Sequence, residues 1–362
     1  MKVSSCNRAL VTSYYDRVAT DSALVPLEKV AEVVRLFPGR RVTRDEMMEH
    51  LPHVDAVLIS DEVFDAAVFQ EAPRLGMICA DGVGVNSVDL DAATKAGVIV
   101  NNAPFVHEAN GDFTIGLILA LLRRIVAADR GVRAGRWNER KDYLGTGLSG
   151  LSLGLLGFGR AAQAVARRAV GFNCEILAYC RQPDVAAAEA LGVTLVDFET
   201  LLGQSDILSI HVKLTGETTG MIARHQIDRM KAGAYLVNTS RGLVCDEPSL
   251  IEALQNGKLA GAAIDVFPEE PPPTDHPLFA MENVVVTPHM ASDATEAFHS
   301  VFQGAVKDML LFFGGLTPTH VVNPAVLSHP RVCQLGADSS SNESLAECGF
   351  MEEDGDCVSS RE

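Results

Sequence analysis

The chain has 362 residues and a formal net charge of −17, with 47% apolar and 21% charged residues. This length fits two domains better than one, and the composition is that of a globular protein with buried cores. The acidic balance argues against binding to nucleic acid or to an anionic membrane surface. Eight cysteines without a CxxC pair predict reduced thiols in a cytoplasmic protein, and the most apolar segment, 113–122, is too short to span a bilayer.

Short apolar runs alternate with helical patterns in the first third of the chain. Thr43 is followed three residues later by Glu46, which is the spacing of a helix capping box. Gly97 stands where a helix that begins near Asp89 is expected to end. The alternation predicts a doubly wound parallel α/β sheet, with strands at Arg8–Tyr15, Asp55–Ser60, Leu75–Asp81 and Val98–Asn101.

A long amphipathic stretch from Glu108 to Ala134 precedes a second series of the same kind. One further helix, Thr295–Phe313, comes after that series. Residues 331–362 are rich in serine, glycine and acidic residues, so we predict a disordered acidic tail. The strands predicted for the second series are Leu151–Leu156, Glu175–Cys180, Ile207–His211, Ala234–Asn238, Ala262–Phe267 and Val284–Thr287.

A GxGxxA motif follows the strand that ends at Leu156 and opens the next helix. Gly157 would allow a tight turn, Gly159 would let the backbone approach a pyrophosphate, and Ala162 would permit close helix–strand packing. The unpaired N–H groups at the start of the helix would face the anion. We therefore predict a dinucleotide site rather than only a tight turn, with contacts from Gly157, Phe158, Gly159, Arg160 and Ala161.

The end of the second strand of this series departs from the usual NAD pattern. A carboxylate is expected there to bind the ribose hydroxyls, but the chain has Cys180 followed by Arg181. An arginine at this point can make a charge-assisted bond to a 2′-phosphate. The sequence thus favours NADP(H), with NAD(H) still possible. The alternative is a surface arginine beside a buried cysteine.

Three further polar segments fall at strand ends, at residues 237–247, 262–271 and 286–289. Reduction of a 2-oxo acid needs a cation for the substrate carboxylate and carbonyl, and a proton donor for the developing alkoxide. Arginine offers a rigid bidentate fork to a carboxylate, and histidine is the natural proton donor near neutral pH. A nearby glutamate would orient the histidine and favour its protonated form. Taken singly, each residue could also be an ordinary cap or loop residue.

These segments, the glycine turn, Gly82–Asp91 and the region of Trp137 together resemble the D-isomer-specific 2-hydroxyacid dehydrogenase family. The family includes glyoxylate/hydroxypyruvate reductases and phosphoglycerate dehydrogenases, and the resemblance covers about residues 50 to 325. It implies that Arg241 contacts the substrate carboxylate and carbonyl. It also implies that His289 is the general acid/base and that Glu270, rather than Glu269, is its partner.

The resemblance implies further contacts around the two ligands. Backbone N–H groups near Val83 and Gly84 would hold the substrate carboxylate, and Asp265 would lie by the nicotinamide carboxamide. The other expected cofactor contacts are Cys180, Arg181, His211 and Thr239. No metal ligand set is expected.

The family architecture implies two α/β domains. A flavodoxin-like substrate domain would comprise residues 1–103 and 290–330, and a Rossmann nucleotide-binding domain would be inserted at 104–289, ahead of the tail at 331–362. The active site would lie in the cleft between them. The family is usually dimeric through its nucleotide domain, and the apolar helix after Glu108 suits a homodimer.

Two positions depart from the family pattern. Lys213 replaces a proline near the expected adenosine site, where it would assist a 2′-phosphate or be an exposed lysine. Gly111 lies inside a predicted helix and costs about 1 kcal/mol relative to alanine, which suggests a close approach to the cofactor domain.

The residues after the strand at Asp55–Ser60 narrow the substrate class. The chain continues Ser60-Asp61-Glu62, with no basic side chain for a substrate phosphate. This favours a small 2-oxo acid such as glyoxylate or hydroxypyruvate, and NADPH would suit its reduction. Two alternatives stay open: an NAD-linked D-2-hydroxyacid oxidation, and an NAD(H)-sensing scaffold like the C-terminal-binding corepressors. The missing ribose carboxylate fits poorly with the scaffold.

Overall fold

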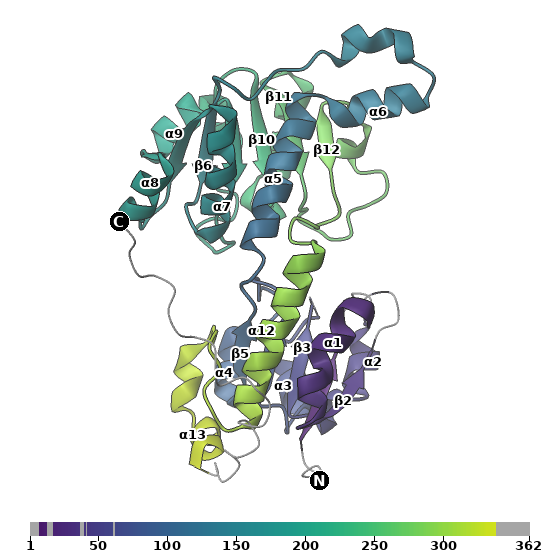
Figure 1. The fold of residues 1–362 in the computed structure, drawn as a ribbon, viewed down its shortest axis with the longest axis vertical. Coiled ribbons are helices and arrows are strands. Elements are labelled where there is room, and N and C mark those ends of the chain that lie inside the picture. Colours follow the sequence, from purple (N-terminus) through teal and green to yellow (C-terminus); the bar gives the residue numbers. More distant parts are fainter. Residues whose placement is uncertain (1–6, 13–16, 37–39, 41, 61, 338–362) are drawn as a thin grey trace, which may run out of the picture. The chain divides into compact units, whose positions relative to one another are not determined.

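The computed structural model describes residues 7–12, 17–36, 40, 42–60 and 62–337. The chain divides into two compact units, one formed by Met1–Val106 with Ala294–Glu362 and the other by His107–Asp293. Each unit contains one parallel sheet with helices on both faces (Figure 1). The predicted fold class, two doubly wound parallel α/β domains, is confirmed.

The sheet of the first unit has the strand order β2-β1-β3-β4-β5, which is the order of flavodoxin-like folds. Helices α1 and α12 cover one face, and α2, α3 and α4 cover the other. Neighbouring residues of β3 point to opposite cores, Val57 to one and Leu58 to the other, as the alternation of a strand requires. The strands are β1 Arg8–Val11, β2 Glu32–Arg35, β3 Ala56–Ile59, β4 Met77–Ala80 and β5 Ile99–Asn102. The helices are α1 Arg17–Glu28, α2 Arg44–Met48, α3 Ala66–Glu71, α4 Leu90–Ala96 and α12 Thr295–Phe313.

Local signals in this unit were good predictors of helix ends. Thr43 and Glu46 form the expected capping box at the start of α2. Gly97 ends α4 in the left-handed conformation, at φ +70. Strand β2 was not predicted, because it lies at the sheet edge and its residues are only half-buried or exposed, so its apolar pattern is weak.

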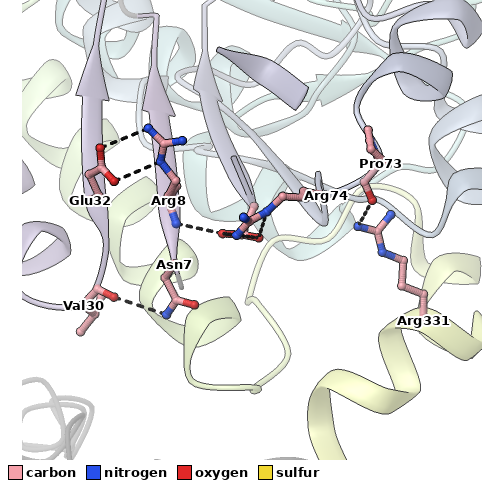
Figure 2. Close-up of polar contacts among 8 residues, drawn as sticks. Asn7, Arg8, Val30, Glu32, Pro73, Arg74 and Arg331 are labelled. Carbon is pink, nitrogen blue, oxygen red and sulfur yellow. Dashed lines mark hydrogen bonds and ion pairs between the residues drawn. The ribbon is translucent and has the colours of Figure 1, made fainter. Parts of the chain in front are cut away.

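The prediction that disorder begins at residue 331 is wrong for the first residues of the tail. They form helix α13, Pro330–Ala337. Arg331 donates to the carbonyl oxygen of Pro73 at 2.9 Å (Figure 2). It also donates to the carbonyl oxygen of Ala96 at 3.4 Å, and Val332 packs against the core. Ala96 ends α4, so the arginine satisfies an orphan carbonyl at a helix terminus. The predicted disorder of residues 338–362 lies outside the described residues.

The sheet of the second unit has the order β12-β11-β10-β9-β6-β7-β8. This is the Rossmann arrangement with one extra strand, and β6 and β9 flank the point at which the strand order reverses. The strands are β6 Ser152–Leu156, β7 Glu175–Tyr179, β8 Thr194–Leu195, β9 Ile207–Ile210, β10 Ala234–Asn238, β11 Leu259–Ile264 and β12 Val284–Val286. The helices are α5 His107–Leu122, α6 Ile125–Arg133, α7 Arg160–Ala169, α8 Val185–Leu191, α9 Phe198–Gln204, α10 Arg224–Arg229 and α11 Glu247–Gln255.

The long helical stretch predicted from Glu108 to Ala134 is two helices. The chain breaks between α5 and α6 at Arg124, which has a φ of +53. Helix α5 packs against α7, and a Cβ at Gly111 would lie 2.9 Å from the Cβ of Ala164. The close approach expected at Gly111 is thus made to the helix that follows the glycine turn. No helix in the described ranges is long and apolar enough to cross a membrane.

Candidate active site

The chemically important segments of the second unit follow strands β6, β9, β10, β11 and β12. These strands run parallel, so their carboxyl ends lie at one edge of the sheet. In open α/β sheets this edge, next to the point of strand reversal, is where ligands bind. The glycine turn, His211, Arg241, Asp265 and His289 are all brought to it.

The glycine turn has the geometry that a dinucleotide needs. Gly157 has a φ of +94, and a Cβ there would lie 2.9 Å from the carbonyl carbon and oxygen of His211. Gly159 is the N-cap residue of α7, and a Cβ there would meet no protein atom within 4 Å. Ala162 is fully buried in the core beneath α7. Protein packing therefore explains Gly157 and Ala162, whereas no protein contact within 4 Å requires a glycine at position 159.

The expected ribose end of the site is exposed and carries one positively and one negatively charged side chain. Arg181, just after β7, forms an ion pair with Glu217 from the loop after β9, and their side chains are 70% and 73% exposed. Cys180 is half-buried, and burial raises the pKa of its thiol. Lys213 lies on the same loop as Glu217, and its backbone oxygen accepts a hydrogen bond from Thr218. Sequence reasoning missed Glu217, because nothing local links it to Arg181.

His211 directly follows β9, next to the glycine turn. Its Nε2 lies 2.8 Å from the Oγ of Ser209. The residue as a whole is half-buried, but its ring is desolvated, and this burial lowers its pKa to about 4. The imidazole is therefore neutral at neutral pH and adds no positive charge to the predicted phosphate site.

Arg241 is held in a turn that a buried asparagine organises. Asn238, only 1% exposed, donates from Nδ2 to the backbone oxygen of Arg241 at 2.9 Å and accepts from the backbone N–H of Ser240 at 3.0 Å. The Nη1 of Arg241 also donates to the Ser240 oxygen, at 2.7 Å. Burial lowers the pKa of Arg241, and Glu270 opposes this shift. Sequence reasoning missed Asn238, although its place at the end of a strand next to the turn could have indicated it.

Glu270 and His289 form a hydrogen-bonded pair, with Oε2 and Nδ1 2.6 Å apart. The other carboxylate oxygen of Glu270 accepts from the backbone N–H of Phe267 at 2.9 Å. Burial raises the pKa of Glu270, but the hydrogen bond to His289 and the charges of His289 and Arg241 outweigh it, so the net pKa lies below its usual value. Arg241, Glu270 and His289 thus belong to one electrostatic cluster, and Glu270, not Glu269, is the residue that contacts His289.

The remaining predicted site residues are buried or half-buried, and their contacts lie within their own units. Asp265 is fully buried, with its carboxylate turned to the loop that follows β12. Thr239 is nearly buried, and its Oγ1 lies 3.2 Å from that of Thr114. Val83 and Gly84 are half-buried residues that follow β4 in the first unit, and the oxygen of Val83 accepts from the Nδ2 of Asn102 at 2.8 Å.

Known proteins resemble this chain in sequence and in fold. Residues 115–291 match the family described as D-isomer specific 2-hydroxyacid dehydrogenase, NAD binding domain. A glyoxylate reductase from Thermococcus litoralis is 40% identical over 324 residues, covering 87% of this chain and 97% of the relative. A D-3-phosphoglycerate dehydrogenase from Archaeoglobus fulgidus is 40% identical over 284 residues, covering 78% of this chain and 54% of the relative. The crystal structure of a protein from Thermus thermophilus superposes with a TM-score of 0.80 at 35% identity, covering 87% of this chain and 99% of that one.

The family match and the relatives named glyoxylate reductase show that this α/β chain is an oxidoreductase. The chain belongs to the D-isomer-specific 2-hydroxyacid dehydrogenase family. Its cofactor is accordingly a nicotinamide nucleotide.

Proposed function

We propose that this protein reduces a small, unphosphorylated 2-oxo acid, of the glyoxylate or hydroxypyruvate type, with NADPH as the preferred cofactor. The observation that carries the proposal is the Glu270–His289 pair beside Arg241, at the same sheet edge as the glycine turn. The Thermococcus litoralis relative is named a glyoxylate reductase, which supports the substrate class.

The three residues of the cluster divide the work of a carbonyl reduction. Arg241 binds the substrate carboxylate through its planar guanidinium and polarises the carbonyl. Glu270 accepts the hydrogen bond from Nδ1 of His289, so Nε2 is the atom that passes its proton to the substrate oxygen. When bound, the nicotinamide nucleotide supplies the hydride. In the reverse reaction, the oxidation of a 2-hydroxy acid, His289 would act as the base. This NAD-linked oxidation is the alternative function.

The residues around the glycine turn would hold the cofactor. The N–H groups at the start of α7, next to Gly157, Phe158, Gly159, Arg160 and Ala161, would bind its pyrophosphate. Arg181 would bind the 2′-phosphate of NADP(H), and Cys180 and His211 would contact the adenosine end. Thr239 and Asp265 would contact the nicotinamide end.

The side chains at the carboxyl end of β3 favour the proposal that the substrate carries no phosphate. The backbone N–H of Ser60 donates to Glu62 at 2.9 Å, and the Ser60 hydroxyl is hydrogen-bonded to Asp81. Both side chains that these contacts bring to Ser60 are acidic, and neither would bind a substrate phosphate. This observation favours glyoxylate or hydroxypyruvate over phosphoglycerate.

The decisive experiment is the oxidation of NADPH and NADH by the purified chain against a panel of 2-oxo acids. We expect turnover with glyoxylate or hydroxypyruvate, and a higher kcat/KM with NADPH. Faster oxidation of a D-2-hydroxy acid with NAD⁺ would support the oxidative alternative. Absence of turnover on every acid, together with partner capture that depends on bound nucleotide, would support the scaffold instead.

We also propose that the chain forms a homodimer through the second unit. The apolar residues of α5, expected to serve an interface, are largely buried in the unit's own core. Exposed apolar side chains occur instead in the segment after α6, where Trp137 is 73% and Leu144 is 85% exposed. Leu144 also lines a cavity of about 370 Å³ beside α6. If a second copy covers this surface, the wild type should be dimeric by light scattering and the double variant W137E/L144E should be monomeric.

A further inference from the structure

His289 occupies a backbone conformation that its residue type disfavours. Its φ is +54, in the left-handed region, and the only other non-glycine residues there within the described ranges are Arg124 and Asn173. The left-handed region costs energy for any residue with a Cβ, and such residues persist only where the surroundings hold them in place. Something in the fold must therefore oppose the relaxation of this loop.

Asp265 is the group that does so. It is fully buried, and its Oδ1 accepts hydrogen bonds from the hydroxyl of Thr287 at 2.6 Å and from the backbone N–H of Met290 at 2.9 Å. Its Oδ2 accepts from the N–H of Ala291 at 3.0 Å. The backbone oxygen of Asp265 accepts from the N–H of His289 itself at 2.8 Å. One residue thus binds the loop before, at and after His289.

We propose that Thr287, through its hydrogen bond to buried Asp265, is a positioning residue that keeps His289 in the left-handed conformation required for catalysis. The inference rests on the proposed role of His289 as the general acid/base. The Thr287 hydroxyl is the one side-chain donor among the four contacts, so it can be removed without changing the backbone. Its loss leaves Asp265 with one donor fewer in an apolar interior, where each contact to a carboxylate counts more than in water.

The consequence for catalysis depends on the distance between Nδ1 of His289 and Oε2 of Glu270. A relaxed φ at His289 would move the imidazole and lengthen this 2.6 Å contact. A displacement of about 1 Å of a catalytic group lowers turnover by up to about a hundredfold. The substrate carboxylate is held by other residues, so substrate binding changes little. The expected signature is a loss in kcat without a matching rise in KM.

The test compares T287V, which keeps the side-chain shape but removes the hydroxyl, with the conservative variant T287S. We expect kcat of T287V to fall between about 10- and 100-fold, with KM for the 2-oxo acid and Kd for NADPH within about twofold of the wild type. T287S restores most of kcat. In the same proteins, amide hydrogen exchange at Met290 and Ala291 is faster in T287V than in T287S, because the loop opens more often.

Two outcomes overturn the proposal. Wild-type kcat in T287V shows that the hydroxyl has no positioning role, and a loss confined to NADPH binding shows that it serves the cofactor. Should T287V not fold, T287A and T287S provide the same comparison. The exchange measurement does not need turnover, so it reports on the Asp265 network even if His289 is not the acid/base. Whether His289 is the acid/base is tested separately by the turnover of H289A.

Discussion

The two ends of the proposed site lie on one sheet edge but are built in opposite ways. At the catalytic end, Asp265 is fully buried and is hydrogen-bonded to the loop that carries His289, while the side chains of Glu270 and His289 are 23% and 42% exposed. At the ribose end, Arg181 and Glu217 meet as an ion pair with about three quarters of each side chain exposed. Buried networks have few alternative arrangements, and exposed pairs are weak and screened by salt. We therefore expect changes at the catalytic end to have large effects on rate, and changes at the ribose end to adjust affinity gradually.

The largest effect should come from His289→Ala. General acid–base catalysis contributes roughly 10²–10⁴-fold, so kcat should fall by about that factor. NADPH binding, measured by fluorescence titration, should be unchanged, because His289 is predicted to contact the substrate. Near-normal turnover in this variant would refute the acid/base role.

Burial also acts on the ring of His211, next to the glycine turn, and its effect can be tested through pH. Its folded pKa of about 4 lies below its usual value of 6.5, so between these pH values the unfolded chain binds more protons. The free energy of unfolding should thus fall as pH drops from 6.5 towards 4, by about 1.4 kcal/mol for each pKa unit of difference. In H211N this part of the decline should be missing from urea-unfolding curves. If the free energy of unfolding depends on pH equally steeply in the wild type and in H211N, the pKa of His211 is not lowered by folding.

Arg181→Asp tests the exposed side. Loss of the charge-assisted bond to the 2′-phosphate, with a repulsive charge in its place, should weaken NADPH binding by roughly 1.5–3 kcal/mol. NADH binding should change much less, since NADH has no 2′-phosphate. The measurement is Kd for each nucleotide at several salt concentrations. If NADPH affinity is unchanged, the assignment of Arg181 to the 2′-phosphate is wrong.

Glu217→Gln should have the smallest effect, and it should raise the affinity for NADPH where Arg181→Asp lowers it. The variant releases Arg181 from its partner, and an exposed ion pair contributes about 0.2–1 kcal/mol, so NADPH should bind up to about fivefold more tightly. A matched control is E199Q, which removes another exposed pair of the same unit, that between Glu199 and Arg229. If E217Q and E199Q behave alike, the Arg181–Glu217 pair has no influence on cofactor choice.

Much of the fold could be predicted because its signals are local. The capping box at Thr43, the left-handed end of α4 at Gly97 and the glycine turn at Gly157 depend on residues a few positions apart. The strand at β2 and the break at Arg124 could not be predicted in this way. The edge strand buries little apolar surface, and the break is not marked by glycine or proline.

The amino-acid sequence by itself determined that this is an α/β chain with a dinucleotide turn and an arginine, a glutamate and a histidine at strand ends. Local propensity and motif spacing are sufficient for that. Only the tertiary structure decided that Glu217 meets Arg181 and that Asp265 holds the loop of Thr287. Each of these contacts joins residues whose separation along the chain carries no signal. Their meeting depends on the path that the whole sheet imposes.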